Sequence, residues 1–154
     1  MPDPIPAVDA FIATSATTYA LTLSTHPYPM KTAFATYLAS HPAIRAIFVG
    51  TRRTDPHGST LSAFDPTDRG WPDFMRVHPV VEWHYAEVWA FLREVGVPYC
   101  GVYDLGFTSL GGRGDTRPNP RLAVRDDGGG GVVGYRPAFE LVEDGEERLG
   151  REKG

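Results

Sequence analysis

The chain lacks several features that mark common protein classes. It has one cysteine, Cys100, among 154 residues, so no internal disulfide can form and a reducing compartment such as the cytoplasm is indicated. No apolar run approaches the length that crosses a bilayer, and residues 1–11 lack the basic segment and apolar core of a signal peptide. We therefore expect a cytoplasmic protein with no membrane partner.

An excess of positive charge is also missing. The net charge of −4 gives no electrostatic attraction for nucleic acid, so no nucleic-acid partner is expected. Lysine is scarce, with Lys31 and Lys153 the only two among 15 basic residues. Arginine is the better bidentate phosphate ligand. The chain is equally rich in Ala, Gly and Pro, however, as GC-rich genomes favour, so only arginines at particular positions are candidates.

The short motifs of several enzyme classes are absent from the sequence. Neither G-x-x-x-x-G-K-[ST] nor G-x-G-x-x-G occurs, and there is no G-x-S-x-G, which leaves phosphate-cradling loops and serine hydrolases of those kinds unsupported. The five histidines show no i,i+4 pair and no cysteine partner, so no zinc site is visible. Cys100 is interpreted as a small buried residue, not a nucleophile.

What is present predicts an α/β domain. The sequence predicts a helix over residues 7–18, a strand over 19–24, a helix over 30–42 and a strand over 43–50. The last of these is mostly apolar and reads as a buried parallel strand. Residues 82–96 give the clearest helical pattern, with Gly96 as its C-cap. We expect one domain over residues 1–154, with a partial parallel sheet and flanking helices.

The remainder of the chain is predicted to be less regular. We expect a long polar connection over residues 50–81 and a short strand followed by a glycine-rich loop over 97–112. A turn-rich stretch (113–122), a flexible glycine insert (126–133) and a charged, partly helical tail (135–154) should follow. The connection should be ordered, because its aromatic and arginine content argues against disorder.

The long connection gathers groups suited to a ligand. It leaves the carboxyl end of a predicted parallel strand, where open α/β sheets bind ligands. Its candidates are Gly50 for close backbone approach, Arg52 and Arg53 for phosphate, Asp55 and Asp68 for a hard cation such as magnesium, Trp71 for a flat ring, and Arg76 for a second phosphate or a ring. The alternative is a surface loop with Asp-Pro turns and solvated arginines. The residues alone leave both interpretations open.

Six segments in a fixed order carry a family resemblance. They are "GTRRTDPHGSTL" (50–61), "TDRGWPDFMRVHPVVEW" (67–83), "VPYCGVYDLGFTSLG" (97–111), "DTRPNPRL" (115–122), "YRPAFEL" (135–141) and "ERLGR" (147–151). With them the chain resembles eukaryotic, especially fungal, FAD synthase (FMN adenylyltransferase) of the PAPS reductase-like group, whose fold is adenine nucleotide alpha hydrolase-like. The likeness covers most of residues 10–152.

The resemblance implies a nucleotidyl transfer in which ATP and FMN, with magnesium, give FAD and pyrophosphate. It implies catalytic roles for Asp55, Asp68, Arg148 and Arg151, flavin contacts for Trp71 and Arg76, and nucleotide contacts for Gly50, Arg52 and Arg53. Arginines and magnesium offset the repulsion between two polyanions, so no nucleophilic side chain is required. Neither the ligands of the metal nor an oligomeric state is indicated.

The chain departs from the family in one respect. A strand with a glycine-rich "GGKD"-type loop, which cradles the ATP phosphates in the family, has no counterpart in the 154 residues. We therefore expect the N-terminal part of the family domain to be missing and the isolated chain to turn over poorly. The alternative is a non-catalytic flavin-binding remnant. A sulfonucleotide reductase is third, because residues 101–154 contain no cysteine.

Overall fold

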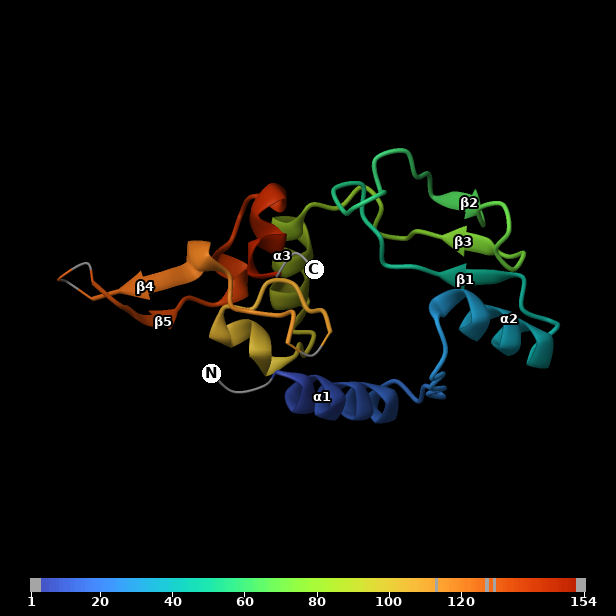
Figure 1. Cartoon of the computed structure of the whole chain (residues 1–154), viewed down its shortest axis with the longest axis horizontal. Helices are drawn as coiled ribbons and strands as arrows, with labels where there is room; N and C mark the ends of the chain where they lie inside the picture. Colours follow the sequence, from blue (N-terminus) through green and yellow to red (C-terminus); the bar gives the residue numbers. More distant parts are fainter. Residues whose placement is uncertain (1–3, 113, 127, 129, 152–154) are drawn as a thin grey trace. The chain divides into compact units, whose positions relative to one another are not determined.

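A computed structural model describes residues 4–112, 114–126, 128 and 130–151. The chain divides into two compact units, residues 23–83 and residues 1–22 with 84–154. Helices occur in both units, and one unit holds a small sheet with a parallel strand pair, which confirms the predicted α/β class (Figure 1).

The unit of residues 23–83 combines one helix with a three-stranded sheet. The helix is α2, Met30–Ser40, as predicted. The strands are β1 (Ala46–Phe48), β2 (Phe64–Pro66) and β3 (Met75–Val77), in the order β1-β3-β2. β1 runs parallel to β3, whereas β2 is antiparallel to it.

The predicted strand at 43–50 is confirmed as parallel but is not buried. Only residues 46–48 form a strand, and the Phe48 side chain is 78% exposed. Successive strand residues point to opposite faces, and only the middle residue, Ile47, is partly buried. The expectation of burial between helices was therefore wrong.

The connection from 50 to 81 is ordered and contains more regular structure than its composition indicates. β2 and β3 lie within it, and each has three residues, too few to show an alternating pattern. The loop between these strands is closed by backbone hydrogen bonds from Thr67 N to Phe74 O (3.2 Å) and from Trp71 N to Asp68 O (3.0 Å). These hydrogen bonds fix the backbone that carries Asp68 and Trp71.

The predicted strand at 19–24 was wrong. The backbone turns at Ala20, which has a positive φ of 51°, and continues without regular structure. Leu21 and Leu23 are each 62% exposed. An alternating sequence forms a strand only when a neighbouring strand pairs with it, and residues 19–24 pair with none of the described strands.

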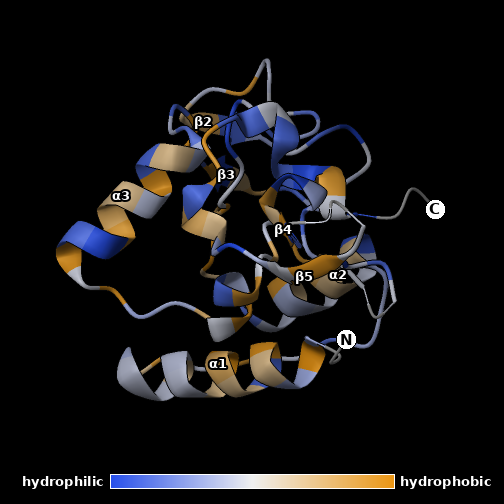
Figure 2. Cartoon of the chain, turned by 90° about the vertical axis from the view of Figure 1, so that its left-hand side faces the viewer, coloured by the Kyte–Doolittle hydropathy of each residue, from blue (hydrophilic) through white to orange (hydrophobic). Residues whose placement is uncertain are grey.

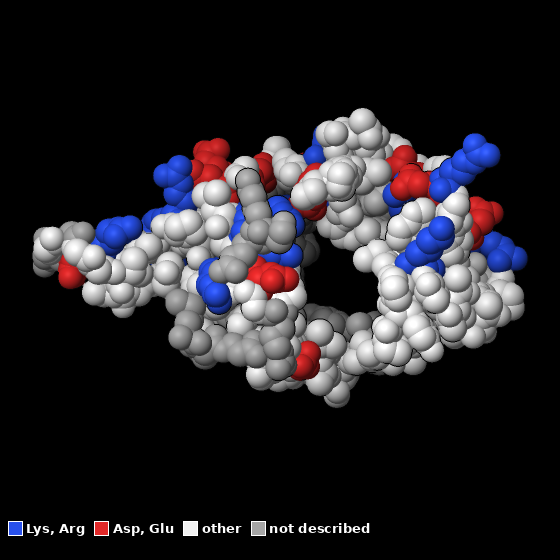
Figure 3. Space-filling view, viewed as in Figure 1, with Lys and Arg blue, Asp and Glu red and all other residues white. Residues whose placement is uncertain are grey.

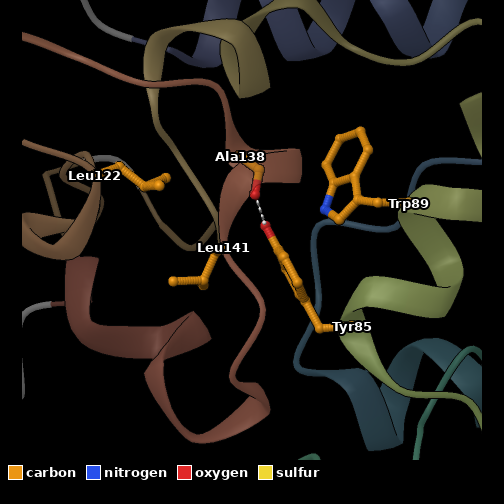
Figure 4. Close-up of a cluster of buried hydrophobic side chains, with 5 residues drawn as sticks. All are labelled: Tyr85, Trp89, Leu122, Ala138 and Leu141. Atoms are coloured by element: carbon orange, nitrogen blue, oxygen red, sulfur yellow. Dashed lines mark hydrogen bonds between the residues drawn. The ribbon is translucent and has the colours of Figure 1, made fainter.

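The other unit contains the predicted helices α1 (Ile5–Thr18) and α3 (Tyr85–Val95). Gly96 ends α3 in the left-handed conformation, with φ of 68°, as predicted for a C-cap. α3 turns two aromatic side chains into a core that is completed by Leu122, Ala138 and Leu141 (Figure 4). The Tyr85 hydroxyl donates to the Ala138 carbonyl (2.9 Å), so its polar end is satisfied within the core.

A second cluster surrounds the cysteine. Cys100, Val102 and Phe107 are buried, and Val8 and Phe11 of α1 pack against them. α1 is accordingly most hydrophobic near its start (Figure 2). Residues 97–100 are not a strand, and Gly101–Leu105 form the 3-10 helix η1, so the predicted strand was wrong. The interpretation of Cys100 as a buried residue is confirmed, since it is 4% exposed.

The remaining segments hold short elements. β4 (Ala123–Arg125) and β5 (Val132–Tyr135) form a hairpin on the two sides of the glycine insert. The insert was predicted to be flexible, and two of its residues, 127 and 129, lie outside the described residues. Three further 3-10 helices are η2 (Pro120–Leu122), η3 (Ala138–Glu140) and η4 (Asp144–Gly150). Among the described residues, no helix combines the length and apolar character needed to traverse a lipid bilayer.

Candidate functional site

A cavity of about 200 Å³ lies within the unit of residues 23–83. α2, the end of β1, the β2–β3 loop and β3 contribute its walls. Its lining residues are Met30, Phe34, Val49, Thr67, Asp68, Trp71, Phe74 and Arg76. We call it the α2–β3 pocket. A mostly apolar lining with a few polar groups is typical of a small-molecule site.

Aromatic side chains supply flat walls to the α2–β3 pocket. Phe34 of α2 contacts Phe74, with ring centroids 5.1 Å apart and planes tilted by 48°. Trp71 lines the same pocket and is 39% exposed, so part of its indole remains open to solvent. Aromatic faces of this kind favour a planar ring as ligand, because offset stacking adds attraction to the burial of apolar area.

Arg76 provides the positive charge of the pocket. It is the middle residue of β3, opposite Asp65 of β2 and Ile47 of β1. One terminal nitrogen donates to the Pro66 carbonyl (2.9 Å) and lies 3.4 Å from a carboxylate oxygen of Asp68. Its Nε is buried and has no hydrogen-bond partner within the described part of the chain. A buried donor without a partner is costly, so an acceptor on a ligand would stabilise this arrangement.

Asp68 is the accessible carboxylate of the pocket. Its side chain is 74% exposed, and it makes a long ion pair of 3.4 Å with Arg76. No cluster of three or more His, Cys, Asp or Glu side chains that could hold a metal occurs in the part of the chain that the structure describes. Magnesium, however, is commonly held by one or two carboxylates together with substrate phosphates. Asp68 fits that limited role.

Asp55 is paired with Arg52 and does not line the pocket. Its two carboxylate oxygens accept from the backbone N–H and the guanidinium of Arg52, both at 2.8 Å. Arg52 is 7% exposed. The turn is tight, since a Cβ at Gly58 would lie 2.1 Å from the Arg52 carbonyl oxygen. These two predicted site residues therefore shape the loop through their contact with each other.

Arg53 is also held by contacts within its own unit. Its guanidinium pairs with Glu82 and donates to the Leu61 carbonyl (2.8 Å). The hydrogen bond that the guanidinium donates to the Glu82 carboxylate raises the pKa of Arg53. Gly50, in contrast, has no atom within 4 Å of the position that a Cβ would take. The space beside the Gly50 backbone is open, next to the pocket residue Val49.

The two predicted C-terminal arginines belong to the other unit. Arg148 lies on η4 with an exposed side chain, and its guanidinium has no ion pair or hydrogen bond to any described residue. Arg151 donates through one terminal nitrogen to the Leu110 carbonyl, and Ser109 Oγ lies 3.4 Å from that nitrogen. Arg148 is therefore the more available of the two for a ligand.

Charged side chains do not gather by sign on the face shown in Figure 3. Lys and Arg lie beside Asp and Glu there. Such mixing accords with the net charge of −4 and differs from the positive stripe of nucleic-acid-binding proteins.

Of the predicted residues, Asp68, Trp71 and Arg76 line the α2–β3 pocket, and Gly50, Arg52, Arg53 and Asp55 do not. Sequence reasoning missed five lining residues, namely Met30, Phe34, Val49, Thr67 and Phe74. Met30 and Phe34 lie four residues apart in the helix predicted at 30–42, and this spacing, which places them on one face of that helix, was the available signal. Phe74 is the last residue of the "TDRGWPDF" segment (67–74), and its proximity to Trp71 in the sequence was the available signal.

The chain matches the family model of the phosphoadenosine phosphosulfate reductase domain over residues 13–118. That range exceeds half of the chain and runs through both units. The chain belongs to this family.

Curated relatives of the chain include FAD synthases. The chain is 44% identical over 149 residues to the probable FAD synthase of Schizosaccharomyces pombe, a match over 97% of this chain and 54% of the relative. It is 37% identical to the flavin adenine dinucleotide synthase of Saccharomyces cerevisiae, over 76% of this chain and 40% of the relative. These matches confirm the resemblance to FAD synthases, and the chain spans about half or less of the length of these relatives.

Solved structures agree with the sequence relatives. The crystal structure of Candida glabrata FMN adenylyltransferase in complex with FMN and the ATP analogue AMPCPP matches with a TM-score of 0.86 at 30% identity, covering 94% of this chain and 65% of that one. The same enzyme in complex with FAD and inorganic pyrophosphate matches with a TM-score of 0.88 at 30% identity, covering 96% and 63%. The fold of the chain is therefore that of the FMN adenylyltransferases.

Proposed function

We propose that the chain carries the FMN-binding part of an FMN adenylyltransferase, which joins ATP and FMN into FAD and releases pyrophosphate. The observation that carries this proposal is the α2–β3 pocket, where Trp71 and two phenylalanines offer flat walls and Arg76 holds a buried donor without a partner among the described residues. A tricyclic flavin ring has the planar face and the acceptor atoms that such a pocket favours.

In the proposed complex the pocket residues orient the flavin. Trp71 stacks on the ring, and Arg76 donates from Nε to an acceptor at its edge. A phosphate oxygen of FMN then attacks the α-phosphorus of ATP, a new P–O bond forms, the bond from the α-phosphorus to the bridging oxygen breaks, and pyrophosphate leaves. Positioning and charge neutralisation account for most catalysis of this kind.

Charge neutralisation is assigned to the arginines and to magnesium. Arg148 and Arg151 contact the polyphosphate in this proposal, and Asp68 is the carboxylate that meets a metal carried by the substrate. Magnesium, when bound, would offset negative charge on the transferring phosphoryl group. Gly50, through its open backbone, would contact the nucleotide directly.

The paired residues of the long connection act through its shape in this proposal. The Arg52–Asp55 pair and the Arg53–Glu82 pair hold the loop that follows β1. Asp55 would serve the catalytic site by keeping Arg52 in place.

The family match across both units supports a single domain over residues 1–154, and the lone buried cysteine supports the cytoplasm as its location.

A second candidate is a flavin-binding module without catalysis. The 154 residues contain no Gly-Gly-Lys-Asp segment, so this polypeptide has no visible cradle for the ATP phosphates. Both candidates require FMN binding, and they differ in whether FAD is formed.

Titration of FMN fluorescence with the purified chain tests the shared requirement. Trp71→Ala should weaken FMN binding by about tenfold, because loss of stacking and of aromatic contact area together amount to about 1.4 kcal/mol or more. Phe64→Ala is the matched control, since Phe64 is 63% exposed in the same unit and does not line the pocket. Equal FMN affinity in all three proteins, with Trp71→Ala folded, would remove the flavin from the α2–β3 pocket.

A further inference from the structure

A buried polar contact holds the segment that carries Arg148. Thr108 and Asn119 are 3% and 0% exposed. The Asn119 side-chain amide donates to the Thr108 hydroxyl (2.9 Å) and to the Glu146 carbonyl (2.7 Å). The Thr108 hydroxyl in turn donates to the Glu147 carbonyl (2.6 Å). We call these two side chains the 108–119 clamp.

The clamp is a fully satisfied network. Both amide hydrogens of Asn119 are used, and its Oδ1 accepts from the backbone N–H of Arg121 (2.9 Å). The backbone N–H of Asn119 donates to the Gly106 carbonyl (2.8 Å). A buried network with every member paired fixes one geometry, because any displacement leaves an unpaired polar group in the interior. The clamp therefore specifies where the backbone of residues 146–147 lies.

A second attachment holds the segment on the other side of Arg148. The Arg117 N–H donates to the Gly150 carbonyl (2.8 Å), and a Cβ at Gly150 would lie 2.2 Å from the Arg117 carbonyl oxygen. The backbone is thus fixed immediately before and shortly after Arg148. The Arg148 side chain nevertheless remains exposed, without a partner among the described residues.

We propose that Thr108 and Asn119 are positioning residues, which hold the backbone on which Arg148 is presented to a pyrophosphate-type anion. The inference rests on the proposed function, which assigns phosphate contacts to Arg148. An exposed arginine side chain has few neighbours that restrict its rotamers. The protein therefore orients such a side chain for a ligand chiefly by fixing the backbone that carries it. The buried clamp provides that, although neither of its side chains would touch the anion.

Calorimetric titration with inorganic pyrophosphate tests the proposal on the full chain. Thr108→Val keeps the shape of the side chain and removes the hydroxyl, so pyrophosphate should bind about fivefold to tenfold more weakly, the range expected when a buried hydrogen-bonding group is lost. Thr108→Ser retains the hydroxyl and should stay within about twofold of the unmodified chain. Asn119→Asp, which removes both amide donors and keeps the acceptor, should reproduce the loss.

A double substitution separates positioning from general stability. Arg148→Ala should weaken pyrophosphate binding by itself, and adding Thr108→Val should weaken it no further, because the clamp acts through Arg148. FMN affinity should be the same in the single Thr108 and Asn119 variants, since the clamp residues do not line the α2–β3 pocket. Thermal unfolding of each variant sets an assay temperature at which it is folded.

Three results would overturn the proposal. They are absence of pyrophosphate binding by the unmodified chain, equal loss in Thr108→Ser and Thr108→Val, and additive losses in the double variant. Failure of FMN binding with intact, clamp-dependent pyrophosphate binding would instead count against the proposed function and leave the clamp supported.

Discussion

At the scale of single residues, Arg76 joins the sheet to the ligand pocket. Its backbone belongs to the central strand, and one guanidinium nitrogen is already held by the Pro66 carbonyl. That contact restricts the side chain before any ligand arrives, so little rotamer entropy remains to be lost on binding. The Nε, which has no partner in the described part of the chain, is then left as the group that a ligand can satisfy.

Arg76→Ala should weaken FMN binding by about tenfold to a hundredfold, because a hydrogen bond from a charged donor contributes about 1.5–3 kcal/mol. Arg69→Ala is the control, since Arg69 is an exposed arginine of the loop between β2 and β3 and does not line the pocket. The measurement is the fluorescence titration used for Trp71. If both alanine variants bind FMN as the unmodified chain does, Arg76 is not a flavin contact.

Asp65 makes stability depend on pH. Hydrogen bonds from the backbone N–H and the hydroxyl of Ser62 lower the pKa of Asp65 below its ordinary value. The unfolded chain therefore binds a proton more readily, so this stabilisation is present above the ordinary pKa and is lost as pH falls through the folded one. Ser62→Ala should lower the free energy of unfolding near neutral pH and have less effect near pH ~3. Urea unfolding at both pH values measures this, and an equal loss at both would contradict it.

At the scale of elements, long patterned segments were predictable and short ones were not. The helix at Tyr85–Val95 has an apolar stripe and a glycine stop, and both could be read in advance. β2 and β3 have three residues each and depend on pairing partners elsewhere in the chain. The same dependence explains the error at 19–24, where the alternating sequence has no partner strand among the described residues.

The candidate site shows the same contrast between local signals, which were predictable, and contacts between distant positions, which were not. Asp68, Trp71 and Arg76 meet because one short loop and the strand after it carry all three, so proximity in sequence was informative. The engagement of Arg53 by Glu82 joins positions 29 residues apart, and no local pattern announces such a pair. Arginines in a candidate loop therefore cannot be divided from sequence alone into those that hold the loop and those that are available to a ligand.

The turn at 52–58 can be tested with two glycines. Gly58→Ala should destabilise the chain by about 1–3 kcal/mol, because the new methyl group would lie 2.1 Å from the Arg52 carbonyl oxygen and the turn must shift. Gly50→Ala meets nothing within 4 Å and should change stability by less than about 0.5 kcal/mol. Chemical unfolding measures both, and equal effects would show that the turn is not tightly held.

At the scale of the whole molecule, binding and turnover should separate. We predict that the 154-residue chain binds FMN but forms little or no FAD from FMN and ATP with magnesium, because the sequence holds no Gly-Gly-Lys-Asp segment. Chromatographic detection of FAD is the measurement, with an intact FAD synthase as the positive control. FAD formation at a rate comparable to that control would show that other residues of this chain hold the ATP phosphates.

The division of the chain also has a consequence for how it folds. Residues 23–83 form one unit, and the segments on both sides of them belong to the other. Contacts such as those of Val8 and Phe11 with the Cys100 cluster can form only after the ends of this insert of about 60 residues approach each other, and loop-closure entropy opposes that step. An insert that is already folded holds its ends at a fixed separation, so the entropy has been lost before the flanking segments meet. Folding of the pocket-bearing unit should therefore precede the docking of α1, and a ligand that stabilises that unit would favour this order.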